Sequence, residues 1–162
     1  MNRVKRIMLI TAFLLAHWTA GAQANLNIDA IFDAYGKQGG SILIELGKDV
    51  LGSHTQIKRY KSLIIPSDTA MIRQTEEAIA NDTKGGRTLM ESRKGGTVET
   101  ASYCLKKKDA KTPEYEYILF SGKSQKMTLI YVRGNFPPER LESELRRLKN
   151  LFIKVNNKQI KL

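Results

Sequence analysis

The chain of 162 residues has one cysteine, Cys104, and two histidines, His17 and His54. A lone cysteine excludes a disulfide within the chain. A zinc site needs three or four histidine, cysteine or carboxylate ligands, so these numbers, with no recognisable ligand spacing, predict no metal and no cofactor. We interpret Cys104 as a small buried core residue. An intermolecular disulfide or a reactive nucleophile are the alternatives.

The sequence also lacks a catalytic motif, and we expect no enzymatic activity and no catalytic residue. The glycine pairs at 39–40, 85–86 and 95–96 lack the phosphate-loop pattern and stand where helix ends or a hairpin are expected. His54, beside Ser53, is interpreted as an exposed loop histidine; a hydrolase that uses Ser53, His54 or Cys104 is the alternative. The carboxylate pairs Glu76–Glu77 and Glu114/Glu116 suit solvated positions better than acid–base chemistry.

Long apolar runs are missing except at the start of the chain. Residues 1–24 combine basic residues, an apolar run at 7–16 and small residues that end at Ala22 and Ala24. This order is typical of a secretory signal peptide cleaved after Ala22 or Ala24. The apolar run is too short for a spanning helix, and no stop-transfer segment follows it. We therefore expect an exported protein, periplasmic or otherwise extracytoplasmic, with no transmembrane segment after cleavage.

Negative charge is scarce: the chain has 27 Lys and Arg residues against 16 Asp and Glu residues. Three of the basic residues lie in residues 1–24, so the exported part has a net charge of 24 − 16 = +8. Solubility explains this charge most simply, and attraction to an anionic envelope surface is the alternative that bears on function. Nucleic acid is not expected as a partner, because export and the lack of a basic motif interleaved with aromatic residues oppose it. The run Lys106-Lys107-Lys108, followed by Lys111, is expected to blunt a sheet end.

The periodicity of apolar residues predicts three main helices and six strands. Asn25 or Asn27 is expected to cap the first helix, Ser67 the second, and Pro138 to begin the third. For the tail at 153–162 we prefer a frayed end over an edge strand. The expected helices are 27–35, 68–81 and one from 138 that carries Leu141, Leu145, Leu148 and Phe152, with a short turn at 48–51; the strands are 41–46, 56–65, 88–93, 97–107, 115–120 and 127–133.

These elements predict one α+β domain over residues 25–162, in which helices pack on an antiparallel sheet of about six strands. Short glycine-containing connections such as Gly95-Gly96 require antiparallel neighbours. The segments 31–35, 95–96 and 129–135 resemble a Bacteroidetes family of small exported proteins of unknown function, over roughly residues 25–150. The resemblance implies an envelope location and this α+β fold. It implies no activity, so no functional residue is carried over from it.

These observations favour a non-enzymatic binding module for an envelope protein or an anionic surface component. A small-ligand or lipid carrier, with a pocket between the helices and the sheet, is the second hypothesis. Bulky residues on both sides of the strands support it. A tyrosine-rich sheet face is a possible ligand surface, although strands are rich in tyrosine in any case; the residues are Tyr60, Tyr103, Tyr115, Tyr117 and Tyr131.

Overall fold

The computed structural model describes residues 25–159, and the side chains of residues 25–151. The proposed signal peptide at 1–24, with Ala22 and Ala24, lies outside the described residues. Among the helices of residues 25–159, none combines the length and the apolar character that a membrane-spanning segment needs. The elements are α2 (Asn27–Tyr35), β1 (Ile42–Gly47), α3 (Lys48–Leu51), β2 (Ile57–Pro66), α4 (Thr69–Asp82), β3 (Arg87–Lys94), β4 (Thr97–Cys104), β5 (Tyr115–Ser121), β6 (Lys126–Gly134), a 3₁₀ turn (Pro138–Arg140) and α5 (Leu141–Gln159).

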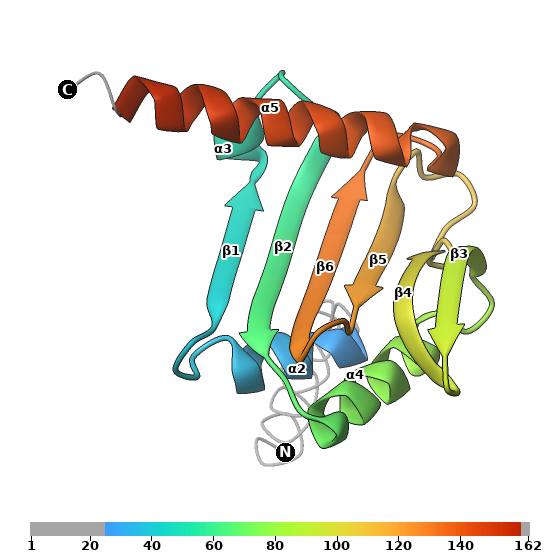
Figure 1. Cartoon of the computed structure of the whole chain (residues 1–162). Helices are drawn as coiled ribbons and strands as arrows, with labels where there is room; N and C mark the ends of the chain where they lie inside the picture. The colour runs from blue at the N-terminus through green and yellow to red at the C-terminus, as the bar shows by residue number, and fades with distance from the viewer. Residues whose placement is uncertain (1–24, 160–162) are drawn as a thin grey trace, which may run out of the picture.

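The six strands form one antiparallel sheet in the order β1-β2-β6-β5-β4-β3, which confirms the expected α+β class (Figure 1). Strands β3 to β6 are a meander, as their short connections predict. The last strand, β6, then joins the N-terminal hairpin, because it pairs with β2 along nine residue pairs. This pairing places residues 57–66 beside residues 126–134 in the middle of the sheet.

Each face of the sheet is covered at only one end. On the first face, which we call the α2 face, α2 and α4 lie at the lower end in Figure 1 and bury a cluster that includes Phe32, Leu63 and Leu129. On the opposite face, the α5 face, α5 crosses the upper end and buries a cluster that includes Tyr117 and Val132. The upper part of the α2 face and the lower part of the α5 face are therefore left without a helix over them.

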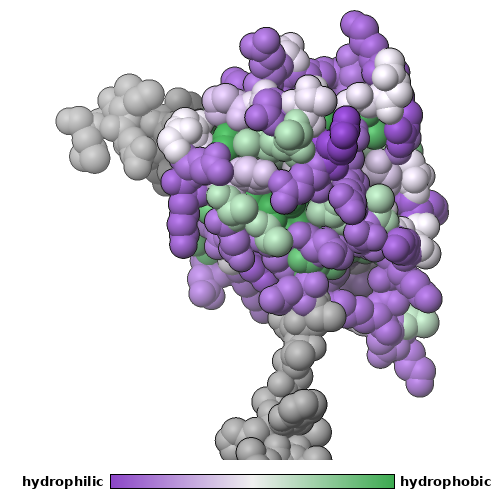
Figure 2. All heavy atoms as spheres, turned by 90° about the horizontal axis from the view of Figure 1, so that it is seen from below, coloured by the Kyte–Doolittle hydropathy of each residue, from purple (hydrophilic) through white to green (hydrophobic). Residues whose placement is uncertain are grey.

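Seen from below, the end that carries α2 and α4 is largely hydrophilic, and its hydrophobic areas are bounded by hydrophilic side chains (Figure 2). The two helices are amphipathic: Ile28, Ile31 and Phe32 of α2 are buried, and so are Ala78 and Ile79 of α4. An amphipathic helix that buries one stripe leaves its polar side to solvent. The outer surfaces of both helices are thus in contact with water.

Two expected helix caps are wrong. Helix α4 is capped by Asp68, whose carboxylate accepts a hydrogen bond from the Met71 amide at 2.8 Å, whereas the Ser67 hydroxyl is buried without a partner. Helix α2 has neither asparagine as its cap. Its cap residue is Leu26, and the Asp82 carboxylate of α4 instead accepts hydrogen bonds from the first backbone amides of α2. A carboxylate distant in sequence thus replaces the local cap that α2 lacks.

Other boundaries also shift. Strand β4 ends at Cys104, not at Lys107, because its partner β3 begins at Arg87, opposite Cys104. Gly95 and Gly96 both have positive φ, at 57° and 82°, as the predicted hairpin requires. The expectation of a frayed tail is wrong for residues 153–159, since α5 continues to Gln159. Leu148, Phe152 and Val155 stand at helical spacing in the sequence, which favours extension of the helix.

Candidate functional site

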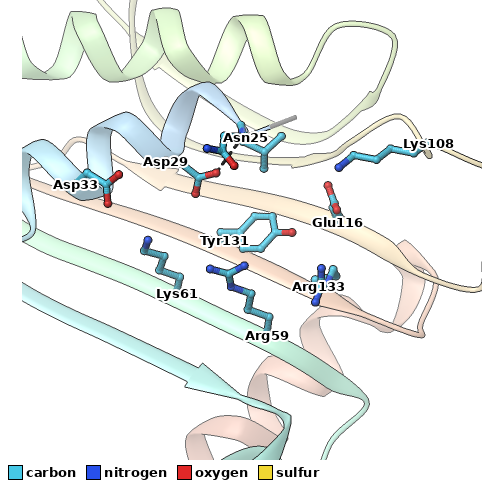
Figure 3. Close-up of a pocket in the computed structure, with 10 residues that line it drawn as sticks. Asn25, Asp29, Asp33, Arg59, Lys61, Lys108, Glu116, Tyr131 and Arg133 are labelled. Carbon is cyan, nitrogen blue, oxygen red and sulfur yellow. Dashed lines mark hydrogen bonds between the residues drawn. The ribbon is translucent and has the colours of Figure 1, made fainter. Parts of the chain in front are cut away.

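A polar pocket of about 260 Å³ lies on the uncovered upper part of the α2 face. Its walls come from α2, β2, β5, β6 and the segment after β4, so it forms only when these elements assemble (Figure 3). Four cations and three carboxylates line it. The lining residues are Asn25, Leu26, Asp29, Asp33, Arg59, Lys61, Lys108, Glu116, Tyr131 and Arg133.

The floor of the pocket contains two arginines side by side. Arg59 of β2 and Arg133 of β6 are direct partners across the two strands, and the Arg133 Nε is buried with no hydrogen-bond partner. Within the described residues, neither guanidinium has a carboxylate within 4.0 Å. Like charges directly opposite on a sheet are destabilising, so this pair offers unused donors and unbalanced positive charge.

The next row of the same face pairs Lys61 of β2 with Tyr131 of β6. Lys61 is 7% exposed; its Nζ lies 2.8 Å from the Glu45 carboxylate and 4.7 Å from the centre of the Phe32 ring. Burial raises the pKa of Tyr131, and the charge of Glu116 raises it further, while Arg133 and Arg59 oppose the shift. The phenol therefore stays protonated at neutral pH and keeps an O–H that can donate a hydrogen bond.

The tyrosine ring occupies the middle of the pocket, and its hydroxyl points toward the side where Glu116, Lys108 and Arg133 lie (Figure 3). Glu116 is the cross-strand partner of Arg133. The carboxylate of Asp29 is already used, because it accepts a hydrogen bond from the Leu26 amide at 3.0 Å. Among the described residues, Arg59, Arg133 and Lys108 have no ion-pair partner within 4.0 Å. The two adjacent guanidinium groups make this side of the pocket suitable for an anionic group.

The residues considered for hydrolysis do not form a site. Ser53 and His54 are exposed in the loop between α3 and β2, whereas Cys104 is buried in β4. Strands β6 and β5 stand between β2 and β4, so the thiol is remote from the loop histidine in the sheet. The interpretation of Cys104 as a buried core residue and of His54 as an exposed residue is confirmed. Within residues 25–159, no cluster of three possible metal ligands exists.

The five tyrosines do not share one face. Side chains alternate across the sheet, so Tyr103 and Tyr131 lie on the α2 face, and Tyr60, Tyr115 and Tyr117 lie on the α5 face. The hydroxyl of Tyr117 donates a 2.6 Å hydrogen bond to the Phe136 carbonyl and is buried. The proposed tyrosine surface is therefore not present as one surface.

The remaining charged candidates separate into structural and pocket residues. Glu114 pairs with Lys58 at 2.8 Å, and Glu76 accepts a hydrogen bond from the Val98 amide at 2.8 Å. In the lysine run, Lys107 lies 3.7 Å from the centre of the Tyr115 ring, while Lys108 reaches the polar pocket. Blunting the sheet end is thus not the whole role of the run.

A second cavity, of about 410 Å³, lies on the other side of the sheet between β3–β6 and the first turns of α5. It is mostly apolar. The apolar residues that line it include Met90, Leu119, Ile130, Leu141 and Leu145. This is the position between a helix and the sheet that the carrier hypothesis requires, although the cavity is a groove open to solvent rather than an enclosed chamber.

The comparisons with known proteins assign a family but no chemistry. A family model described as "Family of unknown function (DUF6108)" matches residues 15–145. No curated protein sequence matches the chain. The matched region includes every strand of the sheet and the first residues of α5. The chain therefore belongs to this family of unknown function.

Proposed function

We propose that the protein is a non-enzymatic binding module of the cell envelope, and that its polar pocket holds an anionic group of an envelope component. The observation that carries this proposal is the adjacent pair Arg59 and Arg133, in which the Arg133 Nε is buried and unpartnered. A buried donor without an acceptor costs about 1–3 kcal/mol, which an incoming anion would recover.

The donor set favours a carboxylate or a phosphate group. Guanidinium groups bind the oxygens of such anions with directional, charge-assisted hydrogen bonds. Lys108 adds a further positive charge, and the protonated Tyr131 hydroxyl adds a neutral donor. The carboxylates of Asp29, Asp33 and Glu116 also line the pocket and disfavour ligands with a high density of negative charge. A single anionic group therefore suits the pocket better than a polyanion.

The envelope location in this proposal rests on the signal-peptide pattern of residues 1–24. Export would bring the pocket to a compartment where acidic sugars, lipid headgroups and acidic protein side chains all offer such a group. The net charge of +8 for the exported part would increase the rate of encounter with an anionic surface.

The test is titration of the purified protein with inorganic phosphate and with acetate, followed by calorimetry or by NMR shifts of the pocket amides. Binding should weaken strongly in the double variant Arg59→Gln/Arg133→Gln. The matched control is Lys84→Gln/Lys94→Gln, which removes two exposed cations outside the pocket. Equal loss in both double variants would mean that net charge, and not the pocket, attracts the anion. No binding of either anion by the unmodified protein would refute the proposal.

The apolar groove supports a second candidate, a carrier of small apolar ligands. Leu119 and Ile130 are partly exposed on its floor, although they belong to the cluster beneath α5. A fluorescent fatty-acid probe should bind there, and Leu119→Lys should abolish the binding without affecting phosphate. Absence of probe binding would remove this candidate and leave the anion pocket untouched.

A further inference from the structure

The two edges of the sheet differ in how well they are protected. β3, at one edge, contains four charged residues, and two irregularities interrupt its register with β4. Charges and bulges of this kind prevent an edge strand from pairing with another chain. β1, at the other edge, pairs with β2 in an unbroken register of six residues and has one charge, Glu45. The free side of β1 is therefore an open template for a further strand.

The surface around β1 is also unusually apolar. Of the four large hydrophobic side chains that are exposed in the described part of the chain, three lie on β1 or just after it. Ile42 is 56% exposed and Leu43 is 38% exposed, and Val50 of α3 is 63% exposed. The single charge is already balanced, because Glu45 lies 2.8 Å from Lys61. Neither charge nor side-chain polarity opposes association at this edge.

We propose that β1 pairs with β1 of a second copy of this chain, in antiparallel orientation, to form a dimer with a continuous twelve-stranded sheet. In a two-fold pair of this kind the axis is perpendicular to the sheet, and each face of one copy continues into the same face of the other. Cross-strand partners must then lie on the same face. Ile42, Ile44 and Leu46 lie on the α5 face, since they pair with Ile64, Ser62 and Tyr60 of β2.

The sequence of β1 selects one register. With the axis at Ile44, Ile44 lies opposite its own copy and Ile42 lies opposite Leu46, so every pair on the α5 face is apolar. On the α2 face Leu43 then lies opposite Glu45. A shift that centres the axis on Glu45 would place two carboxylates directly opposite each other, which is destabilising. A one-residue slip that mixes the faces would turn apolar side chains toward the wrong side.

Helix α5 provides a second reason for a two-fold partner. The helix runs along the upper end of the sheet and extends beyond β1 (Figure 1). The two-fold axis at Ile44 rotates the partner by 180° within the plane of the sheet. The lower part of the partner's α5 face, which no helix covers, is then placed against the end of α5 that extends beyond β1. The partner's helix covers the corresponding surface of the first copy. Each chain thus supplies the cover that the other lacks near Ile42 and Ile64.

The test begins with sedimentation equilibrium on the full protein, which should give twice the monomer mass. Ile42→Lys should raise the dimer dissociation constant by about tenfold or more, because each interface would bury two unpaired ammonium groups. The matched control is Met90→Lys on β3, which adds the same charge at a residue that is 50% exposed on the opposite edge. This control should leave the dimer intact. An unmodified protein that is monomeric at all concentrations, or that binds only an added β1 peptide, overturns the proposal.

Disulfide trapping tests the register independently of variant stability. Ile44→Cys should cross-link to its own copy under mild oxidation, because directly opposed residues bring their Cα atoms within the range of a disulfide. Glu45→Cys should not cross-link, since it opposes Leu43. The natural Cys104 is buried and provides the background. Cross-linking of Glu45→Cys alone would refute the register, and cross-linking of neither variant in a dimeric protein would place the interface elsewhere.

Discussion

Replacement of Glu144 by alanine should destabilise the protein far more than any other charge removal on α5. The Glu144 side chain is fully buried, and one oxygen accepts hydrogen bonds from the Thr55 hydroxyl and the Gln56 amide, both at 2.9 Å. The other oxygen accepts from Arg140 and Arg147, each at 3.1 Å. The carboxylate therefore ties α5 to the residues that lead into β2.

The magnitude follows from the groups left behind. Thr55 and Gln56 would each lose an acceptor, and an unsatisfied buried donor costs about 1–3 kcal/mol. Arg140 and Arg147 are 43% and 53% exposed, so water replaces the carboxylate for them at little cost. We expect a loss of about 2–4 kcal/mol in the free energy of unfolding.

Urea denaturation at pH 7, followed by circular dichroism, measures this loss. The matched control is Glu142→Ala, two residues away on the same helix. Its side chain is 86% exposed and pairs with Arg146 at 2.7 Å, so its removal should cost less than about 0.5 kcal/mol. Similar losses in the two variants would refute the view that Glu144 anchors α5.

The pH dependence of the stability provides a second test of the role of Glu144. Burial raises the pKa of Glu144, but hydrogen bonds from Gln56 and Thr55 and the charges of Arg147 and Arg140 outweigh it and hold the pKa below its ordinary value of 4.5. A depressed folded-state pKa adds stability that is complete above the unfolded pKa and is lost as the pH falls through the folded pKa. The difference in the free energy of unfolding between the unmodified protein and Glu144→Ala should therefore decrease only below pH 4.5.

Three further substitutions or reactions test other parts of the fold. Asp82→Ala removes the acceptor of the first α2 amides, including that of Ile28 at 2.9 Å, and should cost about 1–2 kcal/mol in thermal denaturation; an unchanged melting temperature would contradict the distant cap. Tyr117→Phe leaves the Phe136 carbonyl without its buried donor and should cost about 1–2 kcal/mol in urea, so equal midpoints would show that the hydrogen bond contributes nothing. Burial raises the pKa of Cys104, so a thiol reagent should modify it rapidly only in denaturant; fast modification of the native protein would mean that the thiol is accessible.

Local patterns in the sequence were sufficient for most of the fold. Gly95-Gly96 identifies its hairpin because only a positive φ at both residues fits the turn. Alternation of apolar residues identifies the strands, and Pro138 marks the approach to α5. The predicted caps of α2 and α4 are wrong because several polar residues compete at each helix start. For α2 the decisive acceptor, Asp82, is 54 residues away from Ile28.

The pocket could not be predicted, since it depends on the pairing of β2 with β6. The spacing of Arg59 and Lys61 by two residues already indicates that both lie on one face of a strand. Nothing local indicates that Arg133 lies opposite Arg59. Pairing between strands so distant in sequence is decided by the packing of the whole sheet, and the two arginines meet only when it is complete.

The helices cover opposite ends of opposite faces of the sheet. The sheet therefore separates two hydrophobic compartments. Side chains of β5 and β6 alternate between the compartments, so each strand contributes to both while the buried clusters remain on opposite sides. Release of α5 would expose the compartment around Tyr117 and Val132 and leave the one around Phe32 and Leu63 closed. Amide hydrogen exchange should then resolve two opening events. The event with the lower opening free energy releases α5 from its face of the sheet, and the event with the higher opening free energy breaks the backbone pairing of β5 and β6, which both compartments share.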